Sequence, residues 1–381
     1  MPRANISRRQ FSRHVGAALG AAWVAGHWGG APAVGGSPAE SSPSEVIQLS
    51  QNENPYGPSP RALDAMTRSQ AVASRYPNDV GRLVDELARL HGVKPENIAL
   101  GCGSTEILKM ADMAFLGAEK NVVVAEPTYE AVLGYARITR AEPVRVPLTA
   151  DFHHDLPKMA AACTERTGLV YLCNPNNPTA TIVTRDEMAG FFARVPRSTA
   201  ILVDEAYYHF VENPQYTSAL EWLGKVPNLI VARTFSKIYG MAGMRLGYAI
   251  SSAENIRAMR DHVLRFNINT SVVAAALASL ADAELVPAMR KKMNDTRRWL
   301  CRELEKDGRR FMPSEANFLM VEVGSDVQPL IAEFAQRKIL VGRKFPSLPN
   351  WLRISIGTPA ETEAFLSALR EIVPVKGANA A

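Results

Sequence analysis

After about residue 45 the chain alternates between short apolar runs and amphipathic stretches. Residues 97–115 show this most clearly, with an apolar run, a glycine turn and then apolar residues at helical spacing. The other apolar runs are NVVVAEP, GLVYLCNP, AILVDEAYY, NLIVARTFSK and RLGYAIS. Because strands that alternate with helices form βα units, the pattern predicts an α/β fold with a mostly parallel sheet.

The pattern changes at about residue 285. A charged amphipathic helix, RKKMNDTRRWLCRELEKDG, is followed by the strand NFLMVEV, another helix and the strand WLRISIGT. This order predicts a smaller C-terminal α/β domain over residues 286–375, after a large domain over residues 76–285. Pro287 is the expected boundary.

The N-terminus differs from the rest of the chain. Residues 1–33 contain SRRQF, a weakly apolar stretch and the small-residue sequence APA, a pattern that resembles a twin-arginine export signal. Residues 34–45 form a Gly/Ser/Pro-rich linker. We therefore expect a periplasmic or secreted protein. The alternative is a disordered basic tail on a cytoplasmic protein.

Composition narrows the function classes. The chain has 381 residues, 47% hydrophobic and 21% charged, which is typical of a soluble globular enzyme. Four arginines in residues 1–33 account for most of the formal charge of +5, so the folded body is close to neutral. This argues against binding to nucleic acid or to a membrane. The four cysteines are widely spaced, and we expect no metal site.

Polar residues follow four of the apolar runs, at Pro127 to Tyr129, Asn174 to Thr179, Asp204 to Tyr207 and Thr234 to Lys237. In a parallel sheet these endings gather at one edge. They supply what an enzyme that uses pyridoxal phosphate needs: an amine for a Schiff base, an acid for the pyridine nitrogen and an aromatic face.

Each of these residues has a candidate role in holding the cofactor ring. Lys237 is the candidate amine. Asp204 ends an apolar run, where a carboxylate is costly unless paired, and a protonated pyridine nitrogen would pair with it. Tyr207 and Asn177 can bond the ring oxygen, and Tyr129 can stack on the ring.

Donors for the cofactor phosphate come from two turns. The GST sequence opens a helix, whose free N–H groups and dipole suit an anion. Two glycines after the lysine allow its loop to fold back, so that an arginine meets the same anion. The expected phosphate ligands are Gly103, Ser104, Thr105, Thr234, Ser236 and Arg245.

Taken together, these motifs resemble fold-type I aminotransferases, and within them the histidinol-phosphate aminotransferase family. The motifs that carry the resemblance run in order from about residue 48 to 358: NENPYGPSP, RYPND, GCGSTEIL, EPTY, NPNNPT, VDEAYYHF, TFSKIYGMAGMRLGY and LRISIGT. The resemblance implies a seven-stranded sheet in the large domain, an N-terminal arm over residues 46–75 that packs with the small domain, and pyridoxal 5'-phosphate as cofactor.

The resemblance also implies roles for single residues. Lys237 would form the Schiff base. Arg353 and Asn54 would bind the substrate, and Arg353 would hold the substrate's acidic group. Tyr76 would reach the cofactor phosphate of a neighbouring subunit, so a homodimer is expected. One departure is Ala180, where the family usually has glycine, and this change is expected to affect the turn.

The implied activity is transfer of an amino group between an amino acid or amino-phosphate donor and a 2-oxo acid such as 2-oxoglutarate. An export signal would be unusual for histidine synthesis, so the chemistry is predicted more firmly than the substrate. The alternatives are a decarboxylase, lyase or racemase with the same cofactor, and a non-catalytic exported binding protein. A nucleotide-binding Rossmann enzyme is disfavoured because no GxGxxG follows a strand.

Overall fold

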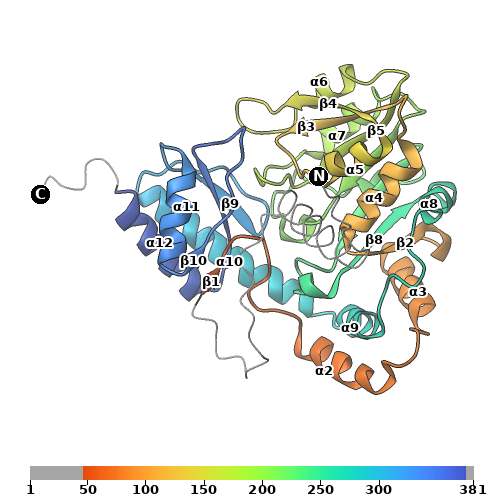
Figure 1. The fold of residues 1–381 in the computed structure, drawn as a ribbon, viewed down its shortest axis with the longest axis horizontal. Helices are drawn as coiled ribbons and strands as arrows, with labels where there is room; N and C mark the ends of the chain where they lie inside the picture. The colour runs from red at the N-terminus through yellow and green to blue at the C-terminus, as the bar shows by residue number, and fades with distance from the viewer. Residues whose placement is uncertain (1–45, 375–381) are drawn as a thin grey trace, which may run out of the picture. The chain divides into compact units, whose positions relative to one another are not determined.

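The centre of the fold is a seven-stranded sheet, shown in Figure 1. The computed structural model describes residues 46–374, so the expected export signal and linker lie outside the described residues. In spatial order the strands are β2 (Ile98–Cys102), β8 (Leu246–Ser251), β7 (Leu229–Thr234), β6 (Ala200–Asp204), β5 (Thr167–Cys173), β3 (Asn121–Glu126) and β4 (Glu142–Pro147). β8 runs in the opposite direction to the other six strands. The predicted α/β fold with a mostly parallel sheet is confirmed.

Helices cover both faces of this sheet. Val122 and Val124 of β3 pack with α4 (Ser104–Phe115), α5 (Ala131–Thr139) and α8 (Ala253–Arg260). Val123 and Ala125, on the opposite side of the pleat, pack with α6 (Leu156–Ala161) and α7 (Arg185–Phe192). Burial on both faces explains why these strands are continuously apolar in the sequence.

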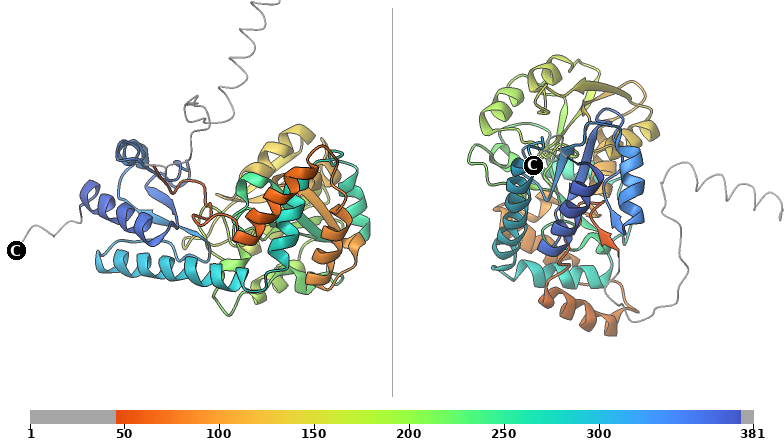
Figure 2. Two further views of the ribbon diagram at one scale, coloured as in Figure 1. Left: turned by 90° about the horizontal axis from the view of Figure 1, so that it is seen from below. Right: turned by 90° about the vertical axis from the view of Figure 1, so that its left-hand side faces the viewer.

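A smaller α/β unit follows. It contains α10 (Leu285–Lys306), α11 (Val327–Gln336), α12 (Pro359–Ile372) and an antiparallel pair formed by β9 (Phe318–Glu322) and β11 (Trp351–Ser355). Pro287 lies in the first turn of α10, where its missing N–H breaks no helical hydrogen bond, so this 22-residue helix runs past the expected boundary. Figure 2 shows α10 running between the two parts of the fold, in agreement with its contacts to α12 and η3 (Tyr208–Phe210).

The N-terminal segment of the described chain divides its contacts. β1 (Ile47–Gln48) pairs in parallel with β10 (Ile339–Leu340), and Ser355 of β11 donates its N–H to the carbonyl of Leu49 at 3.0 Å. By contrast, α2 (Pro60–Ser69) packs against α9 (Thr270–Leu280), and α3 (Val80–His91) lies beside β2. The first part of the expected arm over residues 46–75 therefore contacts the C-terminal unit, and α2 contacts α9.

Residues 46–374 show neither a single membrane-spanning helix nor a cluster of metal-ligating side chains. No single helix there is long and apolar enough to cross a membrane; only α9 and α10 taken together meet that length and composition, and they are bent by 86°. Within the same residues, no group of three or more His, Cys, Asp or Glu side chains could hold a metal ion.

Candidate active site

The predicted site residues follow strands that lie side by side. β3, β5, β6 and β7 are parallel neighbours, so their carboxyl ends meet at one edge of the sheet. Tyr129, Asn177, Asp204 and Lys237 belong to these strand ends or to the loops that follow them. The edge of the sheet therefore brings together residues that are more than 100 positions apart in the sequence.

Asp204 is a buried carboxylate without a cationic partner among the described residues. It is 2% exposed and accepts hydrogen bonds from the Tyr171 hydroxyl at 2.9 Å and the Ala206 N–H at 3.1 Å. Burial raises the pKa of its carboxyl group to about 6, although the Tyr171 bond opposes the shift. A positively charged N–H placed beside this group would lower its pKa and stabilise its charge.

The Lys237 amine bonds two backbone carbonyls and has a lowered pKa. Its Nζ donates to the carbonyls of Gln51 at 3.2 Å and Asn52 at 2.8 Å. Burial, and then the positive charge of Arg353, lower its pKa to about 8, so a substantial fraction of the amine is neutral at mildly alkaline pH. The charges of Lys237 and Asp204 shift each other's pKa, which places both groups in one electrostatic environment.

A hydrogen-bonded chain links the strand ends to the C-terminal unit. The Tyr207 hydroxyl accepts from Asn52 Nδ2 at 3.2 Å and from Asn177 Nδ2 at 3.4 Å. The other end of the Asn177 amide accepts from Arg353 Nη1 at 2.8 Å. Asn177 therefore bridges Tyr207, which is expected to bond the ring oxygen, and Arg353, which is expected to bind the substrate. Both bonds fix the orientation of the Asn177 amide.

Arg245 contacts other residues of the phosphate cup, which comprises the expected phosphate ligands from the start of α4, the end of β7 and the loop after β7. It donates to the Thr105 hydroxyl at 3.1 Å and to the Ser236 hydroxyl at 3.5 Å, and Thr234 donates to Ser236 at 3.0 Å. Gly103 precedes Ser104, the first residue of α4, with φ +77°, and a Cβ there would lie 2.0 Å from Arg245 Nη2. Glycine at 103 therefore leaves room for the Arg245 guanidinium beside the start of α4, where the helix N–H groups and the guanidinium can face the same anion.

Three other predicted residues have different surroundings. Burial, and then the charge of Asp204, raise the pKa of Tyr129 to about 12, so its phenol lies near that carboxylate. Tyr76 is 68% exposed and stacks on Phe266, with ring centroids 4.2 Å apart. The Asn54 amide bonds the Ile238 carbonyl and the Tyr56 N–H, both at 3.0 Å, so both of its ends are engaged by backbone.

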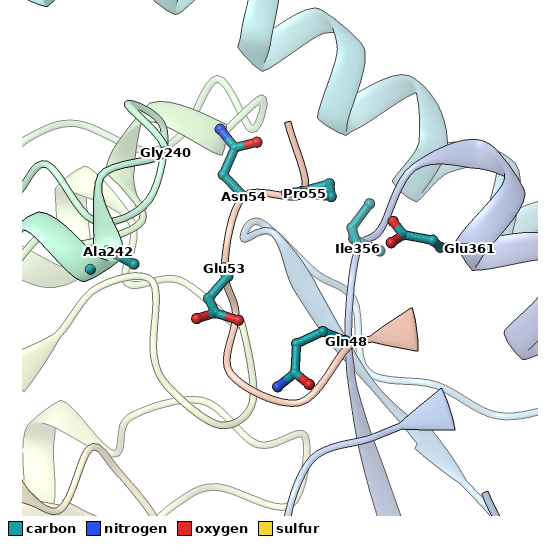
Figure 3. Close-up of a pocket in the computed structure, with 9 residues that line it drawn as sticks. Gln48, Glu53, Asn54, Pro55, Gly240, Ala242, Ile356 and Glu361 are labelled. Atoms are coloured by element: carbon teal, nitrogen blue, oxygen red, sulfur yellow. The ribbon is translucent and has the colours of Figure 1, made fainter. Parts of the chain in front are cut away.

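Asn54 also lines a cavity of about 300 Å³ beside the lysine loop, the segment 235–245 between β7 and β8 that carries Lys237. Figure 3 shows Gln48, Glu53 and Asn54 of the N-terminal segment between Gly240 of the lysine loop and Glu361 of α12. The negative charge of Glu53 acts against the lowering of the Lys237 pKa. The cavity therefore lies where the N-terminal segment joins the two α/β units.

The turn at Ala180 keeps a backbone conformation that favours glycine. Ala180 has φ +61° and is fully buried, its N–H donates to the Asn176 carbonyl at 2.7 Å, and its own carbonyl accepts from the Glu315 N–H at 2.9 Å. The turn accommodates alanine in the left-handed region, where a residue with a Cβ has a strained backbone.

Sequence reasoning missed three residues of the site. Asn52 belongs to the quoted NENP motif but had no role, and Tyr171, the donor to Asp204, lies inside an apolar run where only a packed strand was expected. The third is Arg343, which lies over the Phe345 ring at 4.3 Å, as Arg353 does at 5.3 Å. A second arginine ten positions before Arg353 was the available signal.

The residues present fit pyridoxal phosphate. Asp204 lacks a cation where the pyridine nitrogen would bond, and Arg245 with the start of α4 forms a cradle that a Cβ at Gly103 would fill. Arg353 Nε, although buried, has no hydrogen-bond partner among residues 46–374. The fold and the site thus define a pyridoxal-phosphate-dependent enzyme of fold type I.

Comparison with known proteins identifies the family. The model of the family described as aminotransferase class I and II matches residues 44–369, and the chain belongs to this family. It is a pyridoxal-phosphate-dependent aminotransferase that acts on small amino and 2-oxo compounds. This finding favours transamination over the decarboxylase, lyase, racemase and non-catalytic alternatives.

The relatives place the chain with histidinol-phosphate aminotransferases. It is 38% identical over 352 residues to the histidinol-phosphate aminotransferase of Moorella thermoacetica, with 90% of both chains covered. It is 35% identical over 329 residues to the aromatic amino acid aminotransferase of Cutibacterium acnes, covering 86% of this chain and 93% of that protein. The histidinol-phosphate aminotransferase of Sinorhizobium meliloti, solved in complex with pyridoxal-5'-phosphate, superposes with a TM-score of 0.81 at 29% identity, covering 86% of this chain and 91% of that one.

Proposed function

We propose that Lys237 is the catalytic amine of this aminotransferase and Asp204 the acid that keeps the cofactor ring protonated. The observation that carries the proposal is that a lysine whose pKa is lowered to about 8 and a buried carboxylate that lacks a cation lie at or just after the ends of two neighbouring parallel strands. Tyr207 and Asn177 would hold the ring oxygen, Tyr129 the ring face, and Arg245 with the start of α4 the phosphate.

The residues divide the work of amino transfer. Bound pyridoxal phosphate supplies an aldehyde that condenses with amines and a ring that draws electrons from the substrate Cα. Lys237, once its amine is free, takes the Cα proton as a general base and returns it as an acid. Asp204 holds a proton at the pyridine nitrogen, while Arg353 fixes the substrate's acidic group so that the Cα–H bond faces Lys237.

The donor is a compound with one amine and one acidic group, and the acceptor is a 2-oxo acid such as 2-oxoglutarate. Two relatives support this range, since one is named for histidinol phosphate and another for aromatic amino acids. Arg353 can bond either a carboxylate or a phosphate through its guanidinium.

Replacement of Lys237 tests the proposal. We expect Lys237→Ala to lower kcat by at least about 1000-fold and to remove the visible absorbance of the bound cofactor, because Lys237 supplies both the amine that bonds the cofactor and the group that moves the Cα proton. Lys158→Ala, at a lysine whose side chain is 74% exposed, is the matched control and should remain active. A Lys237→Ala enzyme with normal turnover would refute the assignment.

Two wider proposals concern assembly and location. The exposed pair of Tyr76 and Phe266 supports a homodimer in which Tyr76 completes the phosphate cup of the partner subunit.

The paired Arg8 and Arg9 support twin-arginine export of the folded protein, with residues 76–285 and 286–375 as its two domains. N-terminal sequencing of the mature protein checks the export proposal, and an intact leader on all of the protein would contradict it.

A further inference from the structure

Two guanidinium groups lie together at the expected substrate side of the site. Arg343 and Arg353 lie over the same ring, that of Phe345, at 4.3 and 5.3 Å from its centroid. Burial, and then contributions that include the charge of Arg343, lower the pKa of Arg353 to about 10. The two positive charges therefore act on each other.

Arg353 has only neutral hydrogen-bond partners. It is 8% exposed, and it donates to the Asn177 amide oxygen at 2.8 Å and to the Ser50 carbonyl at 2.7 Å. Within residues 46–374 its Nε has no partner, and no carboxylate lies within ion-pair distance. A buried guanidinium in this condition is stabilised by one anionic group of the substrate.

Arg343, by contrast, already has a carboxylate. Its Nη2 lies 2.7 Å from Glu130 Oε2, and its Nη1 donates to the Lys344 carbonyl at 3.1 Å. The side chains of Arg343 and Glu130 are 52% and 56% exposed. Glu130 directly follows Tyr129, so this ion pair joins the loop after β3, which carries the predicted stacking ring, to the loop between β10 and β11.

Glu130 lowers the net charge of this group of side chains. With the ion pair formed, the two arginines and the glutamate together leave one positive charge, on Arg353. A carboxylate carries one negative charge and can bond Arg353 without disturbing Arg343. A phosphate monoester carries close to two negative charges at pH 8, so its second charge must either displace Glu130 from Arg343 or face it unpaired.

We propose that Glu130 makes this aminotransferase selective for donors with a carboxylate over donors with a phosphate monoester. The inference rests on the proposed role of Arg353 as the clamp for the acidic group and names the class of acid that it receives. Selectivity here arises from a repulsive element as much as from an attractive one, since Glu130 penalises the more highly charged group.

L-histidine and L-histidinol phosphate form the matched pair of donors for the test, because they share the amine and the imidazole and differ in the acidic group. With the holoenzyme and 2-oxoglutarate at pH 8, kcat/KM should be higher for L-histidine. Glu130→Gln, which keeps the shape and removes the charge, should raise kcat/KM for L-histidinol phosphate by about 10-fold and change that for L-histidine by less than about 3-fold.

A binding measurement supplies a readout that does not depend on turnover. Calorimetric titration of the holoenzyme with methyl phosphate and with acetate should give a ratio of affinities that shifts toward methyl phosphate in Glu130→Gln. Glu142 on β4 forms an exposed ion pair with Arg166. Glu142→Gln removes the same charge from that pair and should leave the ratio unchanged. An unchanged ratio in Glu130→Gln, or a wild-type enzyme that prefers the phosphate, overturns the inference.

Replacement of Arg353 separates the inference from the proposed function. If Arg353→Ala weakens binding of both anions while Glu130→Gln leaves their ratio unchanged, only the selectivity role of Glu130 fails. If Arg353→Ala weakens neither anion, the clamp itself is wrong, and the role of Glu130 fails with it.

Discussion

A buried acid on α4 shows how a single residue can make stability depend on pH. Asp112 is fully buried, and neither carboxylate oxygen has a hydrogen-bond partner among residues 46–374. Burial raises the pKa of this carboxyl group to about 8, so it stays protonated in the folded state over most of the neutral range. In the unfolded chain it ionises above pH 4.

The sign of the effect follows from this difference. Between about pH 4 and 8 the unfolded state loses a proton that the folded state keeps, so the free energy of unfolding falls as the pH rises. We expect Asp112→Asn to remove this slope and to be more stable than wild type by roughly 2–4 kcal/mol at pH 8, with little difference at pH 4. Urea unfolding at both pH values measures it.

Asp85→Asn, on the exposed face of α3, is the control for Asp112→Asn and should change stability by no more than about 0.5 kcal/mol. Equal pH slopes in wild type and Asp112→Asn would show that the buried acid is not responsible.

At the scale of elements, the site depends on the contact between the lysine loop and the N-terminal segment. Gly240, three residues after Lys237, has φ +67°, and a Cβ there would lie 2.0 Å from the Gly57 carbonyl oxygen. Asn54 bonds the Ile238 carbonyl in the same contact, and the preceding residues Gln51 and Asn52 hold the Lys237 amine. The two segments are therefore positioned by backbone approaching backbone.

We expect Gly240→Ala to push these two segments apart, because the new Cβ would clash with backbone atoms of Gly57, which no side-chain rotation can clear. The variant should lose roughly 1–3 kcal/mol of stability and at least about 10-fold in kcat/KM. Thermal unfolding and steady-state kinetics measure the two effects. Gly243→Ala is the matched control in the same loop, since its Cβ would meet nothing within 4 Å. If both variants behaved like wild type, the contact would not position the lysine.

At the scale of the whole molecule, the phosphate cup is proposed to be completed by a second copy of the chain. The Tyr76 ring is exposed and stacks on Phe266, which is 57% exposed, and neither ring is covered by the described residues. An exposed aromatic pair on a globular enzyme is typical of an interface. The expected dimer would bury both rings and bring Tyr76 to the partner's cofactor.

Mixing two defective variants tests this arrangement. Tyr76→Ala should weaken cofactor binding, and Lys237→Ala should be inactive. In a hybrid dimer the subunit that keeps Lys237 would receive Tyr76 from its partner. After reversible dissociation and equal mixing, activity at low cofactor concentration should reach about a quarter of the wild-type value, since half of the dimers are hybrids with one complete site. Activity no higher than that of Tyr76→Ala alone would show that Tyr76 acts within its own subunit.

The sequence by itself determined the layered α/β fold and most of the site. Val122 to Ala125 are apolar at every position because both sheet faces are covered, and polar residues at the ends of parallel strands must meet at one edge, which brought Asp204 and Lys237 into a single hypothesis. These relations depend on periodicity and chain direction, which a linear sequence records.

Only the tertiary structure decided contacts between segments that have no periodic relation. The Glu130–Arg343 ion pair joins positions more than 200 apart, the Tyr171 hydroxyl reaches Asp204 from the neighbouring strand, and Asp112 loses its solvent because of the helices and strands packed around it. Each depends on distances across the fold, and burial and charge act through those distances rather than along the chain.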